Sequence, residues 1–89
     1  MRKTKTVKRT WLGRKGETYD YVIRGGRLGK RVSVHRWLDT NEVEIRLIEG
    51  DGRTQNFKEH QKATLNNPTD KEIMDVVKRM AYATKVVRS

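Results

Sequence analysis

The residues of this chain best suited to bind a ligand are its lysines and arginines, and their excess over acidic residues is concentrated in residues 1–36. That segment holds twelve lysines and arginines against two acidic residues, which gives +10, the net charge of the whole 89-residue chain. Residues 37–69 sum to −2 and residues 70–89 to +2. A localised excess of cations on a small protein is typical of a surface that meets a polyanion.

Nucleic acid is the polyanion that this pattern favours. Contacts from lysine and arginine to phosphates gain affinity mainly by releasing condensed counterions, which requires several cations on one surface and no special geometry. Few aromatic residues accompany the cations, which argues against a single-strand stacking platform and favours a duplex. The sequence is nearly silent between DNA and RNA, and duplex DNA is the expected partner. The alternative is a non-enzymatic interaction module, a regulator or inhibitor that docks on an acidic protein partner through Val22, Ile48 and Tyr82.

Motifs for catalysis or metal binding do not emerge from the residue spacing. The glycine-rich segment 24–31 differs from a phosphate-binding Walker A loop, because Arg24 and Arg31 stand where a glycine and a hydroxyl are needed. No serine or threonine is spaced to act with a histidine as nucleophile and base. Glu42 and Glu44 would share a strand face with an arginine, which indicates a solvated charged face. We therefore expect no enzymatic activity, no cofactor and no metal.

The compartment follows from cysteine usage and from the N-terminus. The chain has no cysteine, which excludes disulfides and thiolate metal sites and is typical of a cytoplasmic protein. The basic N-terminus lacks the apolar stretch of about 7–15 residues that a signal peptide needs. We expect an intracellular protein, free or nucleoid-associated, with no membrane association, and its oligomeric state stays open.

A meander of five strands is predicted to position the basic residues. Glycine, asparagine and aspartate divide the first two thirds of the chain into segments rich in β-branched and aromatic residues. The expected strands are residues 5–12, 17–24, 30–38, 42–49 and 53–58. Alternation is clearest at 42–49, where Val43, Ile45 and Leu47 face inward and Ile48 outward. The weak fifth strand is expected at an edge, and residues 60–67 fit either a loop or a short helical turn.

One helix is predicted from residue 69 to about residue 87. The segment Thr69-Asp70-Lys71-Glu72 fits a capping box, with acidic residues near the positive end of the helix dipole. The residues spaced to form one apolar stripe are Ile73, Val76, Val77, Met80, Ala81, Thr84 and Val87. Because that stripe must be covered, the expected fold class is α+β, a small antiparallel meander with one C-terminal amphipathic helix packed on one face.

The expected domain organisation is a flexible basic arm, residues 1–6, followed by a single domain, residues 7–89. The order of strands followed by one helix is similar in outline to the small sheet-plus-helix DNA-binding domains of some integrases and plant transcription factors. The likeness is one of element order and implies no site residue.

The sheet face away from the helix is the candidate interface. In the third predicted strand Val32 and Val34 point to the core, so Arg31, His35 and Trp37 point away from it. The candidate nucleic-acid-binding residues join this row with the cations of neighbouring strands and turns: Lys8, Arg9, Arg14, Lys15, Arg24, Arg27, Lys30, Arg31, His35, Arg36 and Trp37. Trp11 is expected in the core, whereas Trp37 fits either the core margin or a contact with bases.

Overall fold

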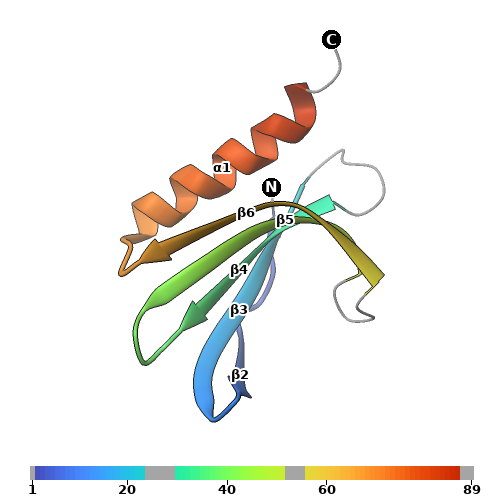
Figure 1. Cartoon of the computed structure of the whole chain (residues 1–89). Helices are drawn as coiled ribbons and strands as arrows, with labels where there is room; N and C mark the ends of the chain where they lie inside the picture. The colour runs from blue at the N-terminus through green and yellow to red at the C-terminus, as the bar shows by residue number, and fades with distance from the viewer. Residues whose placement is uncertain (1, 24–29, 52–55, 87–89) are drawn as a thin grey trace.

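The computed structural model describes residues 2–23, 30–51 and 56–86. Its elements are β1 (Arg2–Lys3), β2 (Val7–Trp11), β3 (Arg14–Val22), β4 (Lys30–Trp37), β5 (Glu42–Asp51), β6 (Asn56–Asn66) and α1 (Asp70–Val86). Within the described residues the strands form one six-stranded antiparallel sheet, in which β1 and β2 both pair with β3, followed by β4, β5 and β6. The helix lies across one face of this sheet (Figure 1). The predicted α+β meander with one covering helix is confirmed.

The core lies between α1 and the sheet face that it covers. On the strands the buried residues of this core are Tyr21, Ile23, Val32, Val34, Val43, Ile45 and Leu47. On α1 they are Ile73, Val77, Met80 and Ala81, with Val76 partly buried beside them. The structure thus confirms the predicted inward residues of segment 42–49. It also confirms the predicted apolar stripe of the helix at the positions whose side chains are described. The side chain of Thr84 and the whole of Val87 lie outside them.

The helix begins at the predicted capping box. The Glu72 backbone N–H donates to Thr69 Oγ1 at 3.2 Å, and the Thr69 backbone N–H donates to Glu72 Oε1 at 2.9 Å. These two bonds satisfy donors that the first turn of a helix cannot pair internally. Asp70 and Glu72 also place negative charge at the positive end of the helix dipole.

The N-terminal segment runs along the edge of the sheet, where the sequence predicted a flexible arm. Arg2 and Lys3 pair with β3 as strand β1. Between β1 and β2, the Thr4 backbone N–H donates to the Asp20 carbonyl at 2.8 Å, and the Asp20 N–H donates to Thr4 Oγ1 at 2.8 Å. The hydroxyl of Thr4 therefore replaces a backbone acceptor where the pairing is interrupted, and the edge of β3 is occupied on both sides of this point.

The last strand is longer than predicted. Strand β6 continues through the segment that the sequence left open between loop and helical turn, and its pairing with β5 reaches Asn66. Ala63 and Leu65 are partly buried against the core, whereas their neighbours Lys62 and Thr64 are exposed. A register shift opposite Leu47 interrupts the alternation and hides the strand pattern in the sequence. The predicted position of this strand at a sheet edge is confirmed.

Three residues other than glycine adopt a positive φ in the described part of the chain. They are Leu12 at 51°, Asn41 at 56° and Asn67 at 50°. Asparagine tolerates this left-handed region, but most L-residues lose about 1–2 kcal/mol there. Leu12 and Gly13, which follows with a φ of 76°, form the two-residue turn between β2 and β3, and positive φ at both positions is the pattern of a type I′ hairpin.

Candidate nucleic-acid interface

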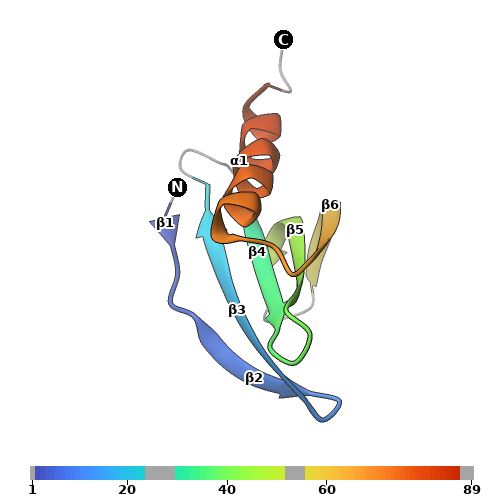
Figure 2. The same ribbon diagram turned by 90° about the vertical axis from the view of Figure 1, so that its left-hand side faces the viewer.

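The sheet face opposite α1, called the open face below, carries no covering element among the described residues (Figure 2). It is hollowed into a groove of about 660 Å³. Because successive side chains of a strand point to opposite faces, every second residue of β2 to β5 contributes to this surface. The basic and aromatic residues of its lining include Arg9, Trp11, Arg31, His35, Trp37 and Arg46. The open face thus holds the basic and aromatic row predicted from the third strand.

Three aromatic rings form a cluster at one end of the groove. The ring centroids of Trp11 and His35 are 4.4 Å apart, those of His35 and Trp37 are 4.6 Å apart, and those of the two tryptophans are 5.8 Å apart, with interplanar angles of 74–79°. Such edge-to-face packing is a favourable arrangement of aromatic rings. The expectation that Trp11 belongs to the core is wrong, since the pairing of Arg9 with Gly16 and of Gly16 with Trp37 brings Trp11 to the open face.

Gly16 makes room for the cluster. A Cβ at this position would lie 3.0 Å from His35 Cε1, 3.2 Å from His35 Nε2 and 3.1 Å from the carbonyl oxygen of Arg36. Such distances are too short for comfortable van der Waals contact, so a side chain at this position would displace the imidazole. The absence of a Cβ lets His35 pack down onto the strand between the two tryptophans.

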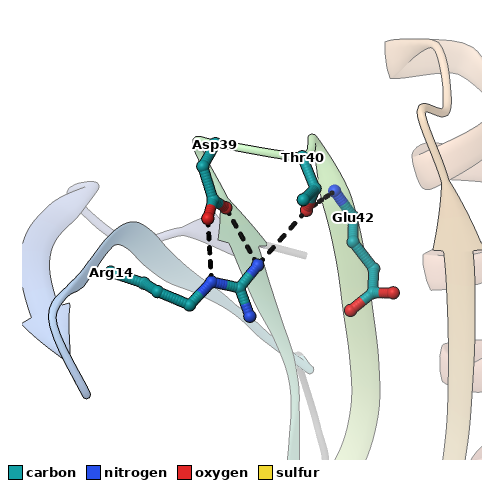
Figure 3. A network of polar contacts seen from close by, with 4 residues as sticks. All are labelled: Arg14, Asp39, Thr40 and Glu42. Atoms are coloured by element: carbon teal, nitrogen blue, oxygen red, sulfur yellow. Dashed lines mark hydrogen bonds and ion pairs between the residues drawn. The ribbon is translucent and has the colours of Figure 1, made fainter.

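Arg14 is held at the end of the groove by the turn between β4 and β5 (Figure 3). Its Nε and Nη2 donate to the two carboxylate oxygens of Asp39, each at 2.9 Å, and Nη2 also donates to Thr40 Oγ1 at 3.4 Å. This hydrogen bonding lowers the pKa of Asp39 below its ordinary value. The guanidinium carbon lies 4.2 Å from the ring centroid of Trp37. Arg14 therefore fixes the hairpin against the neighbouring turn and covers one face of that indole.

Carboxylates neutralise part of the charge of the groove. Arg31 Nη1 lies 3.0 Å from Asp20 Oδ2, and Arg46 Nη2 lies 3.1 Å from Glu44 Oε2. The lining contains four cations and these two carboxylates, a net charge of +2. Its other two cations are Lys5 and Arg9, which form no ion pair with a described residue, although the guanidinium carbon of Arg9 lies 5.9 Å from the ring centroid of Trp11. Lys5 and Arg9 are thus the cations of the groove best placed to meet an external anion.

Several predicted site residues do not lie on the open face. Arg36 points to the helix side, where its Nη1 lies 3.8 Å from Glu17 Oε1 and its Nη2 lies 3.8 Å from Asp70 Oδ1. Strand alternation likewise places three further candidates away from the groove, namely Lys8, Lys15 and Lys30. Two more candidates, Arg24 and Arg27, lie outside the described residues. The open face therefore retains five of the predicted residues: Arg9, Arg14, Arg31, His35 and Trp37.

Lys5, Trp11 and Arg46 are among the lining residues of the open face that were missing from the predicted set. The signal for Arg46 was present, because it alternates with the inward residues Ile45 and Leu47. The positions of Trp11 and Lys5 on the open face depend on how the N-terminal segment pairs with β3. The register of that pairing cannot be read from the sequence. Ile48 is on the predicted face, yet only 5% of it is exposed.

His35 is a half-buried imidazole whose pKa is lowered from its ordinary value. Burial is the main cause, Arg46 and Arg14 add to it, and Glu44 opposes it. The Nε2 atom is buried and has no hydrogen-bond partner among the described residues. The folded protein therefore favours the neutral ring.

As the pH falls, the free energy of unfolding is expected to decrease first through His35 and only at lower pH through the carboxylates. As the pH falls below the ordinary histidine value of 6.5, the unfolded chain takes up a proton more readily than the folded chain, so the free energy of unfolding decreases. The pKa values of Glu49 and Asp39 are lowered from 4.5 and 3.8, so their contributions are lost only at lower pH. Urea unfolding at pH 7 and pH 5.5 measures the effect.

Two variants isolate this contribution. His35→Gln should flatten the dependence of stability on pH between 7 and 5.5, and His60→Gln, a matched change on β6, should leave the contribution of His35 in place. An unchanged slope in His35→Gln would contradict the role of this residue.

No group of three or more histidine, aspartate or glutamate side chains in the described residues could hold a metal ion. Among these residues, no helix has the length and apolar character needed to cross a bilayer. The chain was also compared with protein families, with curated proteins and with solved structures. None of the three comparisons finds a match.

Proposed function

We propose that the chain is a small nucleic-acid-binding protein that prefers duplex DNA and contacts the phosphate backbone through the open face and the β2–β3 hairpin. The observation that carries the proposal is the arrangement of strands. Strands β1, β2 and β4 all pair with β3, and these four strands hold the described cations of the basic segment 1–36 other than Lys5. Their open face is uncovered within the described chain. A sheet-wide basic surface suits a row of phosphates better than a small anionic ligand.

The state of the aromatic rings favours a duplex over a single strand. Proteins that bind single strands stack successive bases on accessible ring faces. Here Trp11, His35 and Trp37 pack edge to face against one another, and Arg14 covers a face of Trp37. These contacts use much of the ring surface that bases would need. In this arrangement the aromatic cluster maintains the shape of the groove, and the surrounding cations contact the phosphate backbone of the duplex.

The alternative of docking on an acidic protein has less support. It requires exposed apolar anchors, and two of the three proposed anchors, Val22 and Ile48, are half-buried and buried, respectively. Only the third, Tyr82 on α1, is well exposed, at 56%.

Salt dependence of binding is the decisive experiment. Fluorescence anisotropy titrations use labelled duplex DNA, single-stranded DNA and duplex RNA at several salt concentrations. For about six contacted phosphates, log K should fall with log salt at a slope near −5 for the duplex. The double variant Lys5→Ala/Arg9→Ala should bind more weakly and reduce the magnitude of this slope by about 2, because each lost phosphate contact removes about 0.9.

A matched control changes the same net charge on the other side of the molecule. Lys71→Ala/Lys78→Ala removes two exposed cations of α1 and should leave the slope near its original value. Binding that does not depend on salt, or equal effects of the two double variants, would exclude the open face as the interface. Tighter binding to the single strand would replace the duplex as the preferred ligand.

A further inference from the structure

Leu12, at the tip of the β2–β3 hairpin, is a large apolar side chain in an unusual position. It is 97% exposed, and its φ of 51° lies in the left-handed region. The other two such positions of the described chain, Asn41 and Asn67, hold the residue type that tolerates this conformation. At Leu12 neither backbone preference nor packing explains the leucine. A strained and exposed apolar residue of this kind points to a role outside the folded monomer.

The surroundings of Leu12 indicate the chemistry of its partner. Residues 7–16, which include the whole hairpin tip, contain four cations and no carboxylate. Arg14 meets Asp39 of the neighbouring turn, whereas Lys15 is exposed and has no ion pair with a described residue. In both ribbon views the tip extends from the end of the sheet that is farthest from the C-terminal end of α1 (Figures 1 and 2). An apolar residue surrounded by these cations fits a polyanion with an apolar interior.

Duplex nucleic acid has this combination of properties. Its phosphates lie outside and its stacked bases inside, and proteins that bend DNA insert apolar side chains, leucine among them, between base steps. Proteins that read DNA with β-ribbons also place their strands in the major or the minor groove. An acidic protein pocket is the competing partner. Arg14 already meets Asp39, but the other three cations of residues 7–16 form no ion pair with a described residue, which suits a row of phosphates better than the mixed charges of most protein surfaces.

We propose that the β2–β3 hairpin enters a groove of duplex DNA and that Leu12 acts as a wedge that unstacks a base step, with Arg9 and Lys15 on the flanking phosphates. This inference rests on the proposed function and assigns the part of the site that deforms the duplex. Leu12 lies at the apex of the hairpin, is 97% exposed and also borders the groove of the open face. The wedge therefore lies beside the groove-lining cations that contact the phosphates.

The test uses a short duplex DNA that carries 2-aminopurine at a central TA step, since pyrimidine–purine steps unstack most easily. The wild-type chain should raise the fluorescence of the probe on binding. Leu12→Asn should bind about tenfold more weakly, a loss of about 1.4 kcal/mol, and should leave the probe dark. Because asparagine suits a type I′ turn, the same variant should unfold at a higher temperature than the wild type. Leu12→Met keeps an apolar side chain and should retain the fluorescence response.

The outcomes separate this inference from the proposed function. Leu12→Asn changes no charge, so its salt slope should equal that of the wild type, whereas Lys5→Ala/Arg9→Ala reduces the slope. If Leu12→Asn binds as tightly as the wild type and raises the fluorescence equally, the wedge is excluded and the proposed function stands. If the wild-type chain does not bind the duplex at low salt, the wedge and the proposed function are both excluded. A protein partner for the hairpin then becomes the favoured hypothesis.

Discussion

Replacing Ile45 with alanine is expected to lower the free energy of unfolding by about 2–5 kcal/mol, the usual cost of removing a large aliphatic side chain from a core. Ile45 is 0% exposed and lies in β5, the central element between β4 and β6 on the face that α1 covers. Truncation leaves a cavity that the flanking strands cannot fill without breaking their pairing. Domains of this size have a total stability of about 5–15 kcal/mol, so a large part of the variant population can be unfolded at 37 °C.

Urea unfolding followed by circular dichroism measures this loss. The matched control is Val7→Ala, which truncates an aliphatic side chain that is 44% exposed on β2 and should lower stability by less than about 1 kcal/mol. Comparable losses in the two variants would mean that the apolar residues between α1 and the sheet do not form the main core.

Replacing Gly16 with valine is expected to destabilise the fold by about 1–3 kcal/mol and to disturb the aromatic cluster at the same time. The added Cβ alone would lie 3.0 Å from the imidazole of His35 and 3.1 Å from the carbonyl oxygen of Arg36. The imidazole already contacts the rings of Trp11 and Trp37, so its displacement disturbs the cluster. The backbone carbonyl is held in the β3–β4 pairing.

Near-ultraviolet circular dichroism and tryptophan fluorescence report the cluster, and urea unfolding reports the stability. Thr10→Val is the matched control, because it places valine at an exposed position of the adjacent strand β2. We expect it to leave both signals close to those of the wild type. A Gly16→Val chain with unchanged tryptophan spectra would show that His35 does not pack against this glycine.

The parts of the fold that local patterns determine were predictable. Period-two alternation in residues 42–49 identified the inward side of β5, because one face of an antiparallel strand is buried and the other is not. Thr69 and Glu72 marked the start of α1, since a capping box satisfies its own donors within four residues. The same alternation placed Arg31, His35 and Trp37 together on the face that α1 leaves open.

Features that depend on pairing between distant segments were not predictable. Trp11 lies on the open face because of the register between β2 and β3, and a shift of one residue would reverse every side chain of β2. Arg36 belongs with the helix side because Glu17 and Asp70 are there. The length of β6 became clear only from its pairing with β5, since the register shift breaks the alternation of its sequence.

The sequence by itself determined the fold class, the start of the helix and the concentration of charge in the first 36 residues, because composition and short-range periodicity control these properties. Only the tertiary structure decided which cations are partnered. Arg14 and Arg31 meet Asp39 and Asp20, which are 25 and 11 residues away along the chain, whereas Arg9 meets no carboxylate among the described residues. Ion pairs between strands depend on register and twist, so a count of charges along the chain cannot distinguish an arginine held by a carboxylate from one that is free to bind a phosphate.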